Sequence, residues 1–289
     1  MKWDSPPKYK HRAFLGRGAF ALVDSVTHEA TGNVYARKSY YVTTGIERAK
    51  TSFETEVAIM RKLQHYQNPH IVRFVEAFKC EERQEFSLIF SPVADGGDLY
   101  RHLSRLYSNH GTLSDEVRLF FSDAVKDLAS GLDFIHKTTI RHRDISPRNI
   151  LIHAGRVLYT DFGVAFDFGA WETSTTASTH PYFHYEYAAP ELHELQPRNH
   201  KSDIFSLGCV FFEVIARCLD EPDLKARTVY EGGTGYGHSA NVDNLQMIRH
   251  HGRIGDLCAS MLRYKRDTRP TAAEVAAEVA LVKSWPPFT

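Results

Sequence analysis

The chain has little that would tie it to nucleic acid, a membrane or the cell exterior. Positive and negative side chains balance at 35 each among 289 residues, so net charge gives no reason to expect nucleic acid or a lipid surface as a partner. The longest apolar run, over residues 205–216, is too short to span a bilayer and contains Glu213. The opening residues, MKWDSPPKYK, lack the apolar core of a signal peptide. We therefore expect an intracellular protein, in the cytoplasm or the nucleus.

Cysteine is also scarce. The four cysteines are far apart and form no CxxC pair, which argues against a disulfide framework or a zinc site and suits a reducing compartment. The 16 histidines are numerous, but none falls in an HExxH pattern or a similar ligand spacing. Most of the histidines are therefore expected to be surface or packing residues.

One stretch concentrates polar residues of chemical interest, namely RHRDISPRNILI at residues 141–152. In it His142, Asp144 and Asn149 precede an apolar triplet, which predicts a short buried strand. Such a strand would pin the polar loop to the core and hold its side chains still, as catalytic groups require. Taken alone, a polar surface loop with a strand behind it is the simpler explanation, so the choice depends on the rest of the chain.

Two glycines and a lysine stand out in the first lobe. Gly16 and Gly18 lie between two apolar stretches and predict a hairpin, in which glycine would let backbone amides approach a phosphate; an ordinary hairpin is the alternative. A predicted strand then places Val34, Ala36 and Lys38 on one inward face. An unpaired ammonium there would be costly, so Lys38 needs an anionic partner unless it reaches solvent at the strand end.

The next helix offers that partner. Apolar residues recur at helical spacing over residues 46–64, and Glu56 lies within this apolar face. Opposite charges on the inward faces of adjacent elements predict a Lys38–Glu56 ion pair. Function explains a buried pair better than stability does, because desolvation offsets the attraction. The alternative is that Glu56 reaches solvent at the edge of the stripe.

A turn-rich connector, PVADGG at residues 92–97, predicts the boundary between two lobes. Asp98 follows it and can cap the next helix, and hydrogen bonds to the hydroxyls of a nucleotide would be a second role. Further on, a predicted hairpin ends in Asp161-Phe162-Gly163. An acid at the exit of a strand suits a metal ligand, with a simple turn as the alternative.

The second lobe is expected to be mainly helical. Ser114 starts a long amphipathic helix that ends near Lys137, and the pair Ser202-Asp203 can cap the apolar helix that follows it. Between these helices, residues 164–187 form a long polar connection, which is either functional or disordered. Residues 220–242 are expected to be a polar insertion.

In their order and spacing these segments resemble one family, the eukaryotic-type protein kinases, from Phe14 to about Val282. Each motif alone is weak, whereas the ordered set is specific. The matching residues are Gly16, Gly18, Phe20, Val23, Ala36, Lys38, Glu56, His142, Arg143, Asp144, Asn149, Asp161, Phe162, Gly163, Ala189, Pro190, Glu191, Asp203, Gly208 and Arg269.

The resemblance implies an α+β, bilobal fold made by a single domain over residues 1–289. After a poorly ordered leader of about 11 residues, an N-lobe at about 12–91 would hold a small antiparallel sheet and one helix. A hinge at 92–97 would join it to a larger, mainly helical C-lobe at about 98–283.

The resemblance also implies a role for each matching residue. ATP would be held by Gly16, Gly18, Val23, Ala36 and Lys38, with Glu56 orienting Lys38 and Asp98 at the ribose. Asn149 and Asp161 would bind Mg²⁺, and Asp144 would take up or orient the proton of a hydroxyl on a protein substrate. Glu191 and Arg269 would form a structural ion pair outside the site. Arg143 would pair with a phosphate on one of six hydroxyls between Thr173 and Thr179.

Two departures from the family pattern bear on activity. Ser146 stands where serine/threonine kinases usually have a lysine, and Arg148 is expected to supply the missing charge and so to belong to the catalytic group. Phe183 and His184 stand where a Gly-Thr pair is usual. We expect an active kinase with a preference for serine or threonine; a pseudokinase that acts as a nucleotide-binding scaffold is the main alternative, and a kinase of small molecules is a weaker one.

Overall fold

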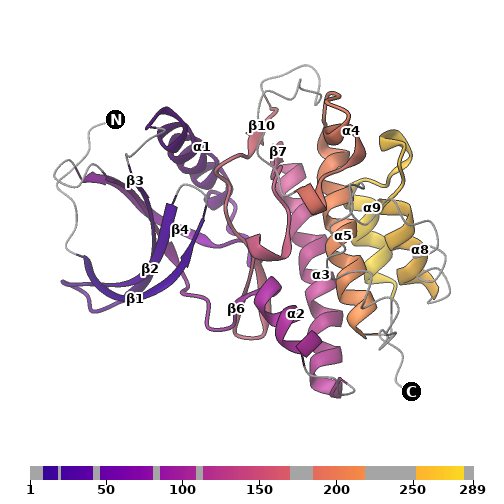
Figure 1. The fold of residues 1–289 in the computed structure, drawn as a ribbon, viewed down its shortest axis with the longest axis horizontal. Coiled ribbons are helices and arrows are strands. Elements are labelled where there is room, and N and C mark those ends of the chain that lie inside the picture. Colours follow the sequence, from indigo (N-terminus) through magenta and orange to yellow (C-terminus); the bar gives the residue numbers. More distant parts are fainter. Residues whose placement is uncertain are drawn as a thin grey trace.

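The computed structural model describes residues 9–18, 21–41, 46–80, 85–108, 113–169, 185–218 and 252–282. They form two lobes, a sheet-rich lobe on the left of Figure 1 and a helix-rich lobe on the right. The expected α+β, bilobal architecture is confirmed. Among the described residues, no helix is long and apolar enough to cross a bilayer.

The first lobe is built on a five-stranded antiparallel sheet with the strand order β1-β2-β3-β5-β4. Its strands are β1 (Tyr9–Arg17), β2 (Ala21–His28), β3 (Val34–Tyr41), β4 (Arg73–Cys80) and β5 (Glu85–Ser91). The hairpin expected around Gly16 and Gly18 joins β1 to β2. The lobe starts earlier than the expected boundary near residue 12, because β1 already begins at Tyr9 and pairs with His28.

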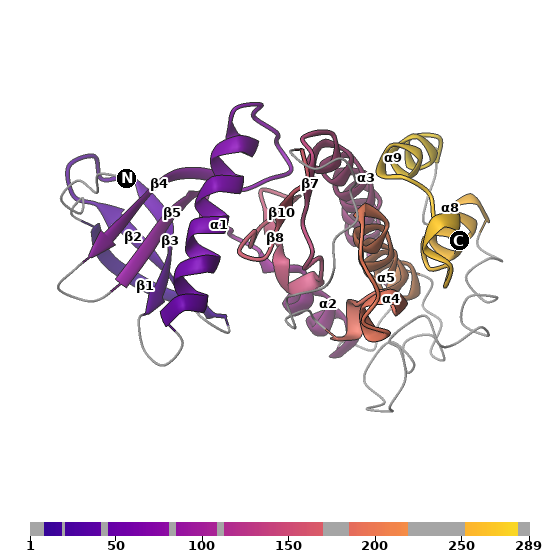
Figure 2. The same ribbon diagram turned by 90° about the horizontal axis from the view of Figure 1, so that it is seen from above.

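Helix α1 (Ile46–Gln64) lies between this sheet and the helical lobe, as Figure 2 shows. Its apolar positions Phe53, Val57, Met60 and Leu63 are all buried, which confirms the predicted amphipathic face. Glu56 belongs to the same face and is completely buried. The helix therefore carries a carboxylate into the space between the two lobes.

The second lobe is a stack of helices, with α3 and α5 nearer the first lobe and α8 and α9 on the far side (Figure 1). The helices are α2 (Leu99–Ser108), α3 (Asp115–Lys137), α4 (Pro190–His193), α5 (His200–Cys218), α8 (Gly252–Met261) and α9 (Ala272–Ala280). Helix α3 begins directly after Ser114, close to the predicted start, and Ser114 caps it, because its side chain accepts a hydrogen bond from the amide of Val117. Helix α5 is buried along nearly its whole length, so it forms the centre of the lobe.

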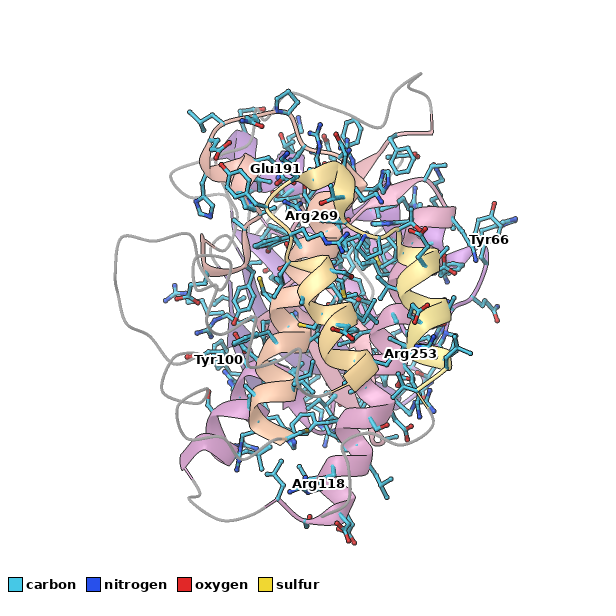
Figure 3. The ribbon with its side chains drawn as sticks, turned by 90° about the vertical axis from the view of Figure 1, so that its right-hand side faces the viewer. Tyr66, Tyr100, Arg118, Glu191, Arg253 and Arg269 are labelled. Carbon is cyan, nitrogen blue, oxygen red and sulfur yellow. The ribbon has the colours of Figure 1, made fainter. Side chains whose placement is uncertain are left out.

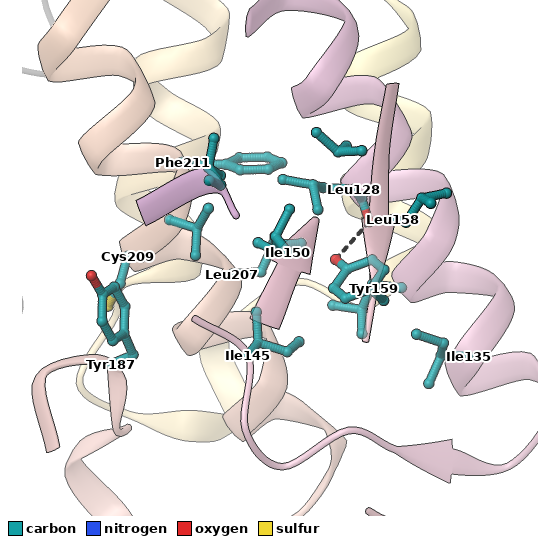
Figure 4. Packing of buried hydrophobic residues seen from close by; sticks show 14 of the residues in the cluster. Leu128, Ile135, Ile145, Ile150, Leu158, Tyr159, Tyr187, Leu207, Cys209 and Phe211 are labelled. Atoms are coloured by element: carbon teal, nitrogen blue, oxygen red, sulfur yellow. Dashed lines mark hydrogen bonds between the residues drawn. The ribbon is translucent and has the colours of Figure 1, made fainter. Parts of the chain in front are cut away.

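Short strands line the boundary between the lobes. One small sheet has the order β6-β8-β9, with β6 (Gly97–Asp98), β8 (Ile150–His153) and β9 (Arg156–Tyr159). A second pairs β7 (Ile140–Arg141) with β10 (Phe166–Asp167). The predicted strand after the polar loop is β8, and Ile150 at its start is fully buried. Tyr159 ties β9 to the core, because its hydroxyl donates to the carbonyl of Leu128 in α3 at 2.9 Å (Figure 4).

The start of α5 differs from the sequence expectation. The helix begins at His200, ahead of the predicted cap at Ser202-Asp203. Asn199 fills the capping role, because its side chain accepts a hydrogen bond from the amide of Lys201 at 2.8 Å. The first turn is polar, so an apolar pattern that starts at Ile204 does not reveal it.

The predicted structural ion pair in the second lobe is present. Arg269 and Glu191 meet side by side in Figure 3, and two parallel hydrogen bonds of 2.8 Å join the guanidinium to the carboxylate. Both residues are buried. The expected insertion at 220–242 and residues 170–184 of the long polar connection lie outside the described residues.

Candidate active site

Three charged side chains from three elements meet between the lobes. The ammonium of Lys38 on β3 donates to Oε2 of Glu56 on α1 at 2.8 Å and to Oδ1 of Asp161 at 2.9 Å. The side chains of Lys38 and Glu56 are only 11% and 1% exposed, whereas Asp161 is 40% exposed. The predicted Lys38–Glu56 ion pair is therefore confirmed, and Asp161, more than a hundred residues away in the sequence, joins it.

Burial and charge act in opposite directions on these groups. Burial alone would lower the pKa of Lys38, but the carboxylates of Asp161 and Glu56 raise it well above its usual range. Burial raises the pKa of Glu56, and the ammonium of Lys38 opposes that rise. Burial also disfavours the ionised form of Asp161, yet the ammonium of Lys38 holds the pKa of the Asp161 carboxyl below its usual value. Lys38 thus stays a cation, and Asp161 stays ionised beside it.

The polar loop after β7 places Asp144 and Asn149 together. The side-chain amide of Asn149 donates to the carbonyl of Asp144 at 2.8 Å and to its carboxylate at 2.7 Å. Asn149 is buried and lies in a short 3₁₀ helix (Pro147–Asn149) that leads directly into β8. Strand β8 therefore anchors the loop, as the apolar triplet predicted.

Asp203, in the first turn of α5, binds the backbone of the same loop. Its carboxylate accepts hydrogen bonds from the backbone amides of His142 and Arg143, both at 2.9 Å, and contacts the ring of His136 at 3.0 Å. Burial opposes ionisation here, but the hydrogen bonds lower the pKa of Asp203 to about 2. The loop backbone is thus held by a carboxylate that stays charged.

The residues expected to bind Mg²⁺ suit that ion. Asn149 uses its amide nitrogen toward Asp144, which leaves its amide oxygen as a donor atom for a cation. Asp161 contributes a partly exposed carboxylate. Among the described residues, no group of three or more His, Cys, Asp or Glu side chains could hold a metal alone. Mg²⁺ fits this pattern because it is usually bound by one or two protein oxygens together with water and phosphates.

The residues expected around ATP lie on or next to the five-stranded sheet, except for Asp98 in β6. Val23 on β2 pairs with Lys38 on β3, and Ala36 is two residues before Lys38 on the same strand. A Cβ atom at Gly16 would meet nothing within 4 Å in the described chain, and one at Gly18 would meet only the carbonyl of Ala21 at 3.7 Å. Packing among the described residues does not require either glycine, and contact with a phosphate stays a prediction.

Asp98 fulfils the simpler of its two expected roles. Its carboxylate accepts a hydrogen bond from the amide of Arg101 at 2.8 Å and lies 3.4 Å from the Arg101 guanidinium, so it caps α2. Contact with a ribose stays a prediction.

Arg148 is exposed, and its guanidinium stacks on the ring of Tyr100 in α2 at 3.6 Å. A second arginine, Arg198, was not foreseen from the sequence. It is buried, its Nε and NH1 have no hydrogen-bond partner among the described residues, and the carboxylates of Asp203 and Asp144 oppose the lowering of its pKa by burial. No local pattern could have identified Arg198, because it lies far downstream of Asp144 in the sequence.

Arg143 lies in a basic environment. Its guanidinium packs over the ring of Phe166 at 4.3 Å, and Arg141 packs over the same ring at 4.6 Å. Burial, followed by the positive charges of Arg198 and Arg141, lowers the pKa of Arg143 to about 9. The hydroxyls proposed to become phosphorylated, from Thr173 to Thr179, lie outside the described residues, so their pairing with Arg143 stays a prediction.

The family model for the protein kinase domain matches residues 9–280. The chain is a protein kinase domain. Among curated proteins it is similar to serine/threonine-protein kinase Nek3 of Mus musculus, 32% identical over 211 residues, covering 70% of this chain and 36% of the relative. Serine/threonine-protein kinase Nek1 of the same species is 31% identical over 209 residues, covering 72% and 16%.

Serine/threonine-protein kinase nekl-2 of Caenorhabditis elegans is 28% identical over 230 residues, covering 75% of the kinase domain and 60% of the relative. The kinase domain thus spans only part of each of these relatives.

Proposed function

We propose that this kinase domain transfers the γ-phosphate of Mg-ATP to a serine or threonine hydroxyl of a protein substrate. The observation that carries the proposal is the pairing of Lys38 with both Glu56 and Asp161, at 2.8 and 2.9 Å. An ammonium held in that way is fixed in position before the substrate arrives, as catalysis by positioning and electrostatics requires. The preference for serine and threonine is supported by the names of the relatives.

In the proposed reaction the substrate oxygen forms a bond to the γ-phosphorus, the bond to the β–γ bridging oxygen breaks, and ADP leaves. The carboxylate of Asp144 accepts the proton of the hydroxyl, and the amide of Asn149 keeps that carboxylate in place at 2.7 Å. Lys38 binds the phosphates, and Gly16, Gly18, Val23 and Ala36 line the nucleotide. Mg²⁺, bound by Asn149 and Asp161, would neutralise charge between the phosphates.

The direct test is phosphate transfer by the purified domain from Mg-ATP to a peptide library, followed by identification of the phosphorylated amino acid. We expect wild-type protein to label serine or threonine and Asp144→Asn to lose the activity. Asp133→Asn is the matched control, because the carboxylate of Asp133 pairs with Lys137 one turn further along α3. The proposal fails if wild type transfers no more phosphate than Asp144→Asn.

A pseudokinase is the second candidate, favoured by the position where the usual lysine is absent. Ser146 is completely buried there, and its hydroxyl has no hydrogen-bond partner among the described residues. Binding of Mg-ATP without any phosphate transfer in the same assay would support this reading. Phe183 and His184, the other departure, lie outside the described residues.

We also propose that Arg148 supplies the charge of the missing lysine. Its guanidinium stacks on Tyr100 but is exposed to solvent, so a phosphate or a substrate group can reach it. Arg148→Ala should reduce turnover at saturating ATP. If turnover is unchanged, Arg148 has no such role, and Arg198 becomes the candidate because Asp144 acts on its charge.

A phosphate on the segment from Thr173 to Thr179 is proposed to pair with Arg143, whose surroundings are strongly basic. Phosphopeptide mapping of active protein tests this proposal, and an unmodified segment in the active protein contradicts it. The substrate is proposed to be a protein met inside the cell.

A further inference from the structure

Tyr40 is a second hydrogen-bond donor to the carboxylate that orients Lys38. It lies two residues after Lys38 on β3, so both side chains point to the same face of the sheet. The Tyr40 hydroxyl donates to Oε2 of Glu56 at 2.6 Å, and this same oxygen accepts from Lys38 at 2.8 Å. The other carboxylate oxygen, Oε1, accepts from the backbone amide of Phe162 at 3.2 Å.

The hydroxyl of Tyr40 also reaches the segment that carries Asp161. A Cβ atom at Gly163 would lie 3.2 Å from that hydroxyl, closer than an ordinary contact. The Tyr40 ring packs edge-on against Phe53 of α1, with centroids 6.2 Å apart, and lies 5.1 Å from the ammonium of Lys38. Tyr40, on β3, therefore contacts α1 and lies beside Gly163.

A buried tyrosine usually finds some partner for its hydroxyl, so a hydrogen bond alone would be unremarkable packing. The identity of the acceptor makes the difference here. Glu56 is completely buried, and its charge is stable only while donors surround it. Tyr40 is itself a dependable neutral donor, since burial and the neighbouring Glu56 raise the pKa of its hydroxyl well above the usual value.

We propose that Tyr40 is a positioning residue of this kinase, which holds Glu56 inward and through it orients Lys38 toward the nucleotide. The inference rests on the proposed function of Lys38 and Glu56. Without the hydroxyl, Glu56 keeps Lys38 and the amide of Phe162 as donors but loses its shortest hydrogen bond. Helix α1 is then held less firmly against the sheet.

The test is Tyr40→Phe, which keeps the ring and removes only the hydroxyl. We expect kcat to fall about tenfold or more, which is the scale of losing a hydrogen bond to a charged group, while KM for ATP changes by less than about threefold. Hydrogen exchange at the Phe162 amide should become faster. The control is Tyr9→Phe, which removes a tyrosine–glutamate hydrogen bond of the same lobe away from the site, namely that to Glu76, and should leave kcat unchanged.

A second comparison separates positioning through Glu56 from a general structural role. In a Glu56→Leu background the acceptor of the Tyr40 hydroxyl is gone, so Tyr40→Phe should change kcat by less than about twofold. An equal loss in both backgrounds overturns the inference, as does a wild-type kcat in Tyr40→Phe alone. An unfolded Tyr40→Phe protein also overturns it, because Tyr40 would then be a folding residue. If instead Lys38→Met retains full activity, the proposed function of the site is wrong, whatever Tyr40 does.

Discussion

Removal of Arg269 should be among the most destabilising single changes in the described chain. Its guanidinium is fully buried and donates to both oxygens of Glu191 at 2.8 Å. The remaining donors are used as well, because Nε bonds the carbonyl of Arg263 at 2.7 Å and NH2 bonds that of Tyr264 at 3.0 Å. One side chain thus joins α4 to the loop between α8 and α9, as Figure 3 shows.

The magnitude follows from what Arg269→Met would leave behind. Among the described residues, Glu191 would keep only the hydroxyl of Ser202, at 2.8 Å, as a side-chain donor to its buried carboxylate. Removing one partner of a buried ion pair lowers the free energy of unfolding by about 3–5 kcal/mol, mainly because the other charge stays buried without a partner. Single domains are stable by only about 5–15 kcal/mol. The substitution should therefore remove a large part of the free energy of unfolding.

The assay is urea unfolding followed by circular dichroism of the helices at neutral pH, with Arg253→Met as the control. Arg253 forms an ion pair of similar length, 2.9 Å, with Glu278, but the two side chains are 55% and 44% exposed. Exposed pairs of this kind contribute about 0–1 kcal/mol. The double variant Glu191→Gln/Arg269→Met should lose less than the sum of its two single variants, because no buried charge remains. If Arg269→Met costs no more than Arg253→Met, the reasoning is refuted.

Two further predictions concern stability. Thr271 and Glu274 form a reciprocal capping box at the start of α9. Thr271→Ala should therefore lower the free energy of unfolding by about 1 kcal/mol, and Thr271→Ser should keep most of the wild-type stability. Equal urea midpoints for wild type and Thr271→Ala would contradict this prediction. The pKa of Asp203 is about 2 in the folded chain and about 3.9 in an unfolded one, so its ionised form stabilises the fold above pH about 4, and this contribution is lost as the pH falls toward 2. The difference in stability between wild type and Asp203→Asn should therefore shrink over that range in unfolding curves measured at several pH values, and a constant difference would disprove the assignment.

The elements that the sequence predicted best are those whose local pattern and tertiary setting agree. The apolar face of α1 has helical spacing, and the bounds of α1 and α3 match the expectation closely. The start of α5 was missed because its capping residue, Asn199, precedes a polar first turn. The polar Ser202-Asp203 pair looked like a cap, whereas the carboxylate of Asp203 accepts hydrogen bonds from the amides of His142 and Arg143.

Without the family resemblance, the candidate site was predictable only where one element by itself showed a chemical need. A lysine on the inward face of a strand needs an anionic partner, so the position of Lys38 predicted its ion pair with Glu56. Arg198, whose lowered pKa is partly offset by the charge of Asp144, could not be found in this way, because nothing near Arg198 in the sequence points to Asp144. Tyr40 was hidden for a different reason. A tyrosine among strand residues is adequately explained by packing, and its hydroxyl acquires a role only from the helix that folds over it.

The position of Tyr40 also bears on how the proposed site would bind Mg²⁺ and still keep Glu56 in place. The ammonium of Lys38 is shared between Glu56 and Asp161, so a cation and phosphates that draw on Asp161 and Lys38 compete with the contacts that hold Glu56. Two donors to Glu56 do not take part in that competition, namely the hydroxyl of Tyr40 and the amide of Phe162. These two donors can keep the carboxylate of Glu56 ionised and buried while the ammonium of Lys38 binds a phosphate. On this reasoning, loss of the Tyr40 hydroxyl should be felt most when nucleotide and metal are bound, which is why the expected loss is in kcat rather than in KM for ATP.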